Sequence, residues 1–184
     1  MTSETYIGLG RITALISFLI GTTILFFYFI SLSADFAFIG LFFFMIAGLV
    51  NIVILVLILI NAIANSNYRK KLLISAGLML INIPIVFFYF FLGGLIANTL
   101  RITFNNSTKD ILTDIRINGC SAKHIDKLNA GESQTIWMKI PGDCAVNIDY
   151  LEKGDRKKAD VATYITNEGG QQLEYNIGGQ NESF

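Results

Sequence analysis

The chain has 184 residues, of which 53% are hydrophobic and 15% charged, and its formal net charge is zero. An ordinary soluble domain contains about 25% charged residues, so this composition indicates a membrane protein. The charges are unevenly distributed: residues 1–98 hold six of them and residues 99–184 hold the other 22. The second part has ten basic and twelve acidic residues and therefore lacks a basic stripe that could neutralise phosphates. Nucleic acid is not an expected partner.

Three long apolar runs predict a membrane domain of three helices over residues 1–98. The first run covers residues 12–32 without a charge, and at about 1.5 Å per residue it would span a hydrocarbon core of about 30 Å. A cleaved signal peptide is the alternative, but its apolar segment usually has only about 7–15 residues. The other runs cover residues 36–64 and 72–97, and the short polar break around Asp35 predicts that the first two helices form an antiparallel hairpin.

The loop between the second and third runs holds a basic cluster, Arg69, Lys70 and Lys71. Short loops rich in Lys and Arg stay on the cytoplasmic side of a membrane. Arg11 would lie on that same side, whereas the loop between the first two runs contains only the acidic Asp35. We therefore expect a cytoplasmic N-terminus and an extracytoplasmic C-terminal part, which would be periplasmic in a bacterium.

Polar residues inside the three runs are few, and none of them is Asp, Glu, Lys, Arg or His. Because ionisable residues form most proton relays and ion pathways, a pump or a secondary transporter acting alone is not expected. Asn51 and Asn82 lie at similar depths in the second and third helices, which predicts a hydrogen bond of about 1 kcal/mol that holds these helices in register. A ligand-binding or pore-lining role is the alternative. Pro84 removes a backbone donor and predicts a kink in the third helix.

After residue 98 the sequence changes to short apolar segments. Apolar and polar residues alternate in residues 111–117 and 146–150, as in strands with one buried face. Turn residues such as Asn118-Gly119 and Pro141-Gly142 separate the segments. Six or seven strands are expected, from residues 100–104, 111–117, 124–128, 135–140, 146–151, 161–165 and 173–177.

Strands of this length and spacing predict a small antiparallel β-sandwich of immunoglobulin-like type over residues 99–178. An open sheet or a small barrel is the alternative. Residues 153–158 are expected to form a solvated hairpin tip, and residues 179–184 a flexible tail.

Cys120 and Cys144 are the only cysteines of the chain. In an oxidising compartment they would pair, and closing this loop of about 24 residues would stabilise the fold by about 3 kcal/mol. A metal site that adds His124 and Met138 is the alternative, but it lacks the second histidine that blue copper normally requires. We expect a disulfide and no metal.

Trp137 is the only tryptophan, and we expect it in the core or on a sheet face of the small domain. Its alternative role is an exposed anchor for a protein partner, since tryptophan is enriched among the residues that dominate interface energies.

Motifs for catalysis do not occur: the sequence has no nucleophile elbow, phosphate-binding glycine loop, metalloprotease helix or paired carboxylates. We therefore expect no enzymatic activity and no cofactor. The sequence favours a non-enzymatic membrane subunit or accessory protein, in contact with lipid, whose helices dock with other membrane proteins and whose outer domain contacts proteins. A component of a channel or transport complex, including a homo-oligomer, is the alternative.

Overall fold

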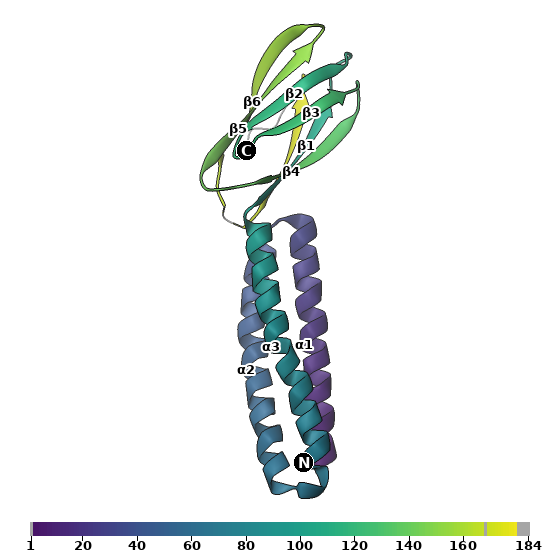
Figure 1. Ribbon diagram of the computed structural model, residues 1–184, viewed down its shortest axis with the longest axis vertical. Helices are drawn as coiled ribbons and strands as arrows, with labels where there is room; N and C mark the ends of the chain where they lie inside the picture. Colours follow the sequence, from purple (N-terminus) through teal and green to yellow (C-terminus); the bar gives the residue numbers. More distant parts are fainter. Residues whose placement is uncertain (1, 168, 180–184) are drawn as a thin grey trace. The chain divides into compact units, whose positions relative to one another are not determined.

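The computed structural model describes residues 2–167 and 169–179. The chain divides into two compact units, residues 1–94 and residues 95–184. The first is made of helices, and the second begins at the end of the third helix and continues as strands (Figure 1). Of the expected tail, residues 180–184 lie outside the described residues.

Three long helices make up the first unit: α1 is Ser3–Ser31, α2 is Ala34–Ala64 and α3 is Arg69–Ala97. A short 3-10 helix, η1, covers Ser66–Tyr68 between α2 and α3. All three long helices are long and apolar enough to cross a membrane. The prediction of three spans is therefore confirmed at the level of length and composition.

The helix ends explain why α1 is longer than its apolar run. The side chain of Thr2 accepts a hydrogen bond from the Thr5 N–H, so the helix begins nine residues before position 12. Between α1 and α2, Leu32 has a left-handed φ of 48° and its N–H donates to the Tyr28 carbonyl. Ser33 then caps α2 through the Asp35 N–H, which gives the expected tight hairpin.

The buried side chains of the helical unit are few and come from all three helices. One hydrophobic cluster contains Ile7, Ala14, Ile54, Ile58, Ala62, Leu72, Ala76 and Met79. Most other large apolar side chains of these helices are exposed, as expected where lipid replaces water as the solvent. The helix α3 continues through Pro84 without interruption.

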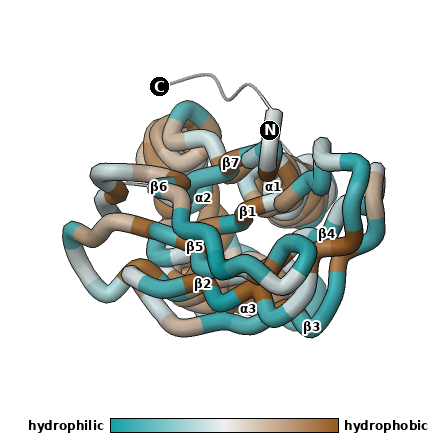
Figure 2. Tube along the Cα trace, turned by 90° about the horizontal axis from the view of Figure 1, so that it is seen from above, coloured by the Kyte–Doolittle hydropathy of each residue, from teal (hydrophilic) through white to brown (hydrophobic). Residues whose placement is uncertain are grey.

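Seven strands form the described part of the second unit, within the six or seven expected from the alternating pattern. They are β1 Thr99–Asn106, β2 Leu112–Gly119, β3 Lys123–Leu128, β4 Ser133–Lys139, β5 Cys144–Glu152, β6 Asp155–Ile165 and β7 Gln171–Ile177. One sheet has the order β4-β1-β7 and the other the order β3-β2-β5-β6. In Figure 2 the strands alternate between hydrophilic and hydrophobic residues, as this layered arrangement requires.

The expectation of a purely antiparallel domain is wrong for one pair. β1 and β7 run parallel, with Ile102 opposite Leu173, while the other paired strands are antiparallel. The reason is the connection: after β6 the chain leaves one sheet and joins the far edge of the other. An immunoglobulin constant domain pairs its second strand with its fifth, as here, but orders its other strands differently.

The expected hairpin tip at residues 153–158 is also revised. Lys153 and Gly154 have φ values of 55° and 91°, and these two residues alone connect β5 to β6. Positive φ at both positions is the geometry of a two-residue type I′ turn. Residues 155–158 therefore belong to β6, whose charged residues occupy an edge of the sheet.

Both sheets contribute to one hydrophobic core. Its fully buried members include Leu100, Ile102 and Phe104 from β1 and Ile115 and Ile148 from the other sheet. Burying a large aliphatic or aromatic side chain contributes about 1.5–3 kcal/mol, so this core is the main source of stability in the β unit.

Candidate functional site

Asn51 and Asn82 both bind helix α1 rather than each other. The Asn51 side-chain amide donates to Ser17 Oγ at 2.8 Å and to the Ala47 carbonyl at 2.7 Å. The Asn82 amide donates to the Ala14 carbonyl at 3.0 Å. The expected bond between the second and third helices is therefore replaced by two bonds to α1, because α1 lies against both of them.

Two further residues belong to the contact of α1 with the other helices, and the sequence alone does not single them out. Ser75 is fully buried on α3 and donates to the Ile7 carbonyl at 3.1 Å. At Gly10, a Cβ atom would lie 2.4 Å from Ile58 Cδ1 and 2.6 Å from Ser75 Oγ. Small residues of this kind let helices approach closely in a membrane, and a Gly followed by a distant Ser gives no local signal in the sequence.

Further polar contacts follow α1 along its length. Ser3 Oγ donates to Asn61 Oδ1 at 2.9 Å, and the hydroxyl groups of Thr22 and Tyr89 share a short hydrogen bond. With the bonds of Ser17, Ile7 and Ala14, these contacts connect α1 to α2 at two positions and to α3 at three. The polar groups in the spans are thus used to hold the helices together, although Asn51 Oδ1 has no hydrogen-bond partner among the described residues.

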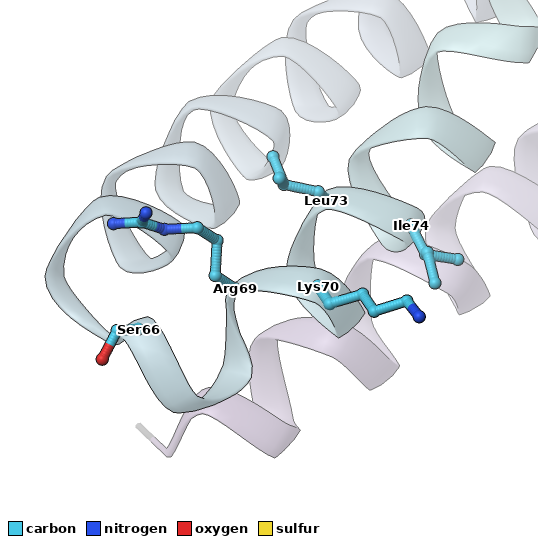
Figure 3. Close-up of a pocket in the computed structure, with 5 residues that line it drawn as sticks. All are labelled: Ser66, Arg69, Lys70, Leu73 and Ile74. Atoms are coloured by element: carbon cyan, nitrogen blue, oxygen red, sulfur yellow. The ribbon is translucent and has the colours of Figure 1, made fainter.

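The basic cluster lies at the start of α3 and borders an open pocket of about 560 Å³. Figure 3 shows its lining residues, Ser66, Arg69, Lys70, Leu73 and Ile74. Arg69 Nε donates to the Ala62 carbonyl at 3.2 Å and so caps the end of α2. Lys71, the third member of the basic cluster, is exposed but does not line this pocket.

A disulfide joins Cys120 and Cys144, with a Cα–Cα distance of 5.2 Å. It connects the end of the β2 region to the first residue of β5, and these strands are neighbours in the four-stranded sheet. Both sulfur atoms are therefore unavailable as metal ligands. Among the described residues, no group of three or more His, Cys, Asp or Glu side chains is arranged to hold a metal ion.

His124 belongs to a charged cluster on the outer face of the four-stranded sheet. Its Nε2 lies 3.1 Å from Asp114 Oδ1, and its Nδ1 lies 3.2 Å from Asp126 Oδ1. Arg116 Nε also donates to Asp114 Oδ1 at 2.9 Å, and Arg156 donates to Asp114 Oδ2. These cationic donors hold the pKa of Asp114 well below its usual range.

Asp114 has a left-handed backbone conformation, which orients its side chain toward these partners. Its φ is 47°, and the register of β2 shifts between Thr113 and Arg116. A bulge of this kind re-aims side chains. The sequence showed charges at alternate positions, but only the strand order brings Arg156 of β6 next to Asp114 of β2.

Trp137 lies on the outer face of the three-stranded sheet, 41% exposed, on the edge strand β4. Its register partner is Arg101, whose guanidinium carbon lies 5.2 Å from the centre of the indole ring. Arg101 also donates to the Gln172 side chain on β7. We call the surface formed by Arg101, Trp137 and Gln172 the Trp137 face. It presents an aromatic ring and a cationic group that contact each other.

Polar side chains extend the Trp137 face along the same strands. Thr103 and Thr135 share a hydrogen bond of 2.9 Å, and Asn105 donates to Asn176 Oδ1 at 3.0 Å. Alternate residues of β1 point into the core, which is why these intervening residues all face outward. The surface can offer hydrogen bonds and an aromatic contact.

Comparison with models of protein families, with curated proteins and with solved structures found no match to this chain.

Proposed function

We propose that this protein is a non-enzymatic membrane subunit or accessory protein. Its helices anchor it and dock with other membrane proteins, while its β unit contacts a protein partner outside the cytoplasm. The observation that supports this most directly is the Trp137 face, an exposed tryptophan held against Arg101 on a sheet edge. Tryptophan and arginine are the residue types most enriched among interface hot spots.

The helices support a docking role rather than transport. The apolar runs 12–32, 36–64 and 72–97 contain no Asp, Glu, Lys, Arg or His, and Ser75 and Asn82 direct their polar groups to the backbone of α1. Such contacts stabilise a helix bundle. The exposed apolar side chains that surround the bundle can contact either lipid or partner helices.

The orientation that we propose places the N-terminus in the cytoplasm. Arg69, Lys70 and Lys71 begin α3 directly after its short connection from α2, and basic residues beside a short loop retain that loop inside. The β unit would then face an oxidising compartment, in which the Cys120–Cys144 disulfide is stable.

Site-specific photo-crosslinking in cells tests the role of the Trp137 face. A photoreactive phenylalanine analogue at position 137 should crosslink to one reproducible protein, identified by mass spectrometry. The matched control is position 164, because Tyr164 is an aromatic residue with 66% exposure on the other sheet. Equal labelling from both positions, or labelling of no protein at position 137, would remove the main support for this function.

Alkylation of intact cells tests the orientation. A thiol reagent applied before reduction should leave Cys120 and Cys144 unmodified if the disulfide forms outside the cytoplasm. Modified thiols in freshly isolated protein would contradict the proposed location of the β unit. Reduction followed by labelling provides the positive control for reactivity.

A component of a homo-oligomeric channel is the second candidate, and one atom favours it. Asn51 Oδ1 is buried within the single chain and has no hydrogen-bond partner among the described residues, so assembly into an oligomer would have to rearrange the helices to give it one. Purified protein in liposomes should then conduct ions, and Asn51→Leu should reduce the conductance. A monomer without conductance would exclude this candidate.

A further inference from the structure

The pocket at the start of α3 has a polar end and an apolar end. Arg69 and Lys70 follow Ser66 by three and four positions, and Leu73 and Ile74 follow Lys70 by three and four. The five residues therefore form one stripe. Ser66, Arg69 and Lys70 come first, and Leu73 and Ile74 follow one turn further into the apolar span. Figure 3 shows the two cationic side chains near the end of the helix and the two apolar ones deeper along it.

The apolar end of the stripe continues as an open helix surface. Leu73 and Ile74 are each 49% exposed, and a Cβ atom at Gly77 would have no neighbouring atom within 4 Å. Leu80 and Ile81, one further turn along, are also about half exposed. An extended hydrocarbon chain would therefore find an unobstructed apolar track along this face of α3.

The polar end has a strong excess of positive charge. Arg69, Lys70 and Lys71 begin α3, and Arg11 lies in α1 near the same end of the antiparallel helices. Among the acidic residues of the described helices, Glu4 lies at this end, while Asp35 is at the opposite end of α2. A basic end of this kind complements an anionic headgroup at the membrane surface.

Arg69 is also positioned for such a ligand. Its Nε atom bonds the Ala62 carbonyl, which leaves the terminal nitrogens of the guanidinium without another bond to the described residues. Ser66 adds a hydroxyl group to the same lining. Guanidinium, ammonium and hydroxyl donors together are a suitable set for a phosphate group.

We propose that this pocket binds an anionic phospholipid. The headgroup phosphate contacts Lys70, while Arg69, whose side chain points to the other side in Figure 3, and Ser66 contribute a charge and a hydroxyl group to the same lining. One acyl chain lies along Leu73, Ile74 and Gly77. The occupant is a lipid rather than free phosphate, because the cationic end continues directly into the apolar track. This proposal does not depend on which protein contacts the Trp137 face. It does not depend on the orientation of the chain in the cell either, because both leaflets of a test bilayer can contain the lipid.

Native mass spectrometry of the full-length protein tests the site. The protein is reconstituted with equal amounts of phosphatidylglycerol and phosphatidylcholine, released into mild detergent, and scored for retained lipid. The wild type should retain phosphatidylglycerol preferentially. Lys70→Gln should lower the phosphatidylglycerol-to-phosphatidylcholine ratio about fivefold, the factor expected for one basic residue at an anionic surface.

The matched control is Lys71→Gln, which removes the same charge from the next residue but not from the pocket lining. It should lower the ratio clearly less than Lys70→Gln does, and Lys70→Arg should preserve the ratio. Circular dichroism must show equal helix content in all variants. Inorganic phosphate added in excess should not displace the lipid.

Three results would overturn the proposal. Equal losses in Lys70→Gln and Lys71→Gln would show general charge attraction without a site. Displacement of the lipid by inorganic phosphate would show that the acyl track does not contribute. If the wild type shows no preference for phosphatidylglycerol, the pocket does not bind an anionic lipid.

Discussion

Large apolar side chains have opposite environments in the two units. In the helical unit, Phe42, Leu49 and Phe87 are 64%, 66% and 70% exposed, whereas Leu100 and Phe104 of the β unit are fully buried. The helices are held together by small residues and single hydrogen bonds, and the strands by a hydrophobic core and a disulfide. The same residue types thus serve different purposes in different solvents.

The physical reason is that lipid is as apolar as a leucine side chain. Burying such a side chain between helices in a membrane gains little hydrophobic free energy, so close packing and polar contacts determine which faces meet. In water, burial of apolar surface is the dominant favourable term, and the positions of buried residues define the fold. Mutations in the two units should therefore have different effects even where the residue change is similar.

The largest effect is expected from removing the disulfide. The double variant Cys120→Ala/Cys144→Ala should lose about 3 kcal/mol of unfolding free energy in the β unit, because the unfolded loop gains freedom. Urea unfolding followed by tryptophan fluorescence measures this in the intact chain, since Trp137 is its only tryptophan. An unchanged midpoint would show that the core alone determines the stability of this unit.

In the helical unit the largest effect is expected at Gly10. Gly10→Leu should destabilise the bundle by about 1–3 kcal/mol, because the new side chain overlaps Ile58 and Ser75. Gly8→Leu is the matched control on the same helix, since a Cβ atom there has no neighbour within 4 Å. Titration with a denaturing detergent, followed by circular dichroism, compares them. Equal stability of the two variants would argue against close packing at Gly10.

Replacing Asn82 and replacing Asn51 should lower the stability of the helical unit by different amounts. Asn82→Leu loses the bond to the Ala14 carbonyl and should cost about 0.6–1 kcal/mol in the same detergent titration. Asn51→Leu loses the bond to Ser17 but also removes an acceptor without a partner, so its cost should be smaller. A larger cost for Asn51→Leu would indicate that its buried carbonyl oxygen accepts a hydrogen bond in the folded protein.

The smallest effect is expected from the exposed charges around Asp114. The pKa of Asp114 in the folded state lies well below its usual range. Its contribution to folding stability is therefore fully present above the unfolded pKa of about 3.9 and is lost as the pH falls through the folded pKa. Asp114→Asn keeps a residue that tolerates the left-handed backbone but removes the charge.

Urea unfolding from neutral to acidic pH tests this contribution. The difference in stability between wild type and Asp114→Asn should be greatest near neutral pH and shrink below about pH 3.9. Arg116, His124 and Arg156 face Asp114, and Asp126 and Asp149 lie nearby on β3 and β5, so the comparison must use the difference between the two proteins. Added salt should reduce it. A difference that is independent of pH would rule out this electrostatic origin.

Some features of the candidate sites could be inferred before the structure, and others could not. Asn51, Asn82 and Trp137 stood out because each is unusual in its local context. Ser75 and Gly10 did not, since small residues are common in apolar helices and their importance depends on the helix opposite. The cluster at Asp114 required the order of β2, β3 and β6, which alternation within single strands does not contain.

The sequence by itself determined the division into an apolar and a polar part, the three spans, the seven strands and the cysteine pair, because these follow from composition, periodicity and count. Only the tertiary structure decided that β7 lies parallel to β1, that both asparagines bind α1, and that Lys70 but not Lys71 lines the pocket. These features depend on which distant segments face one another, and that is set by packing rather than by local pattern.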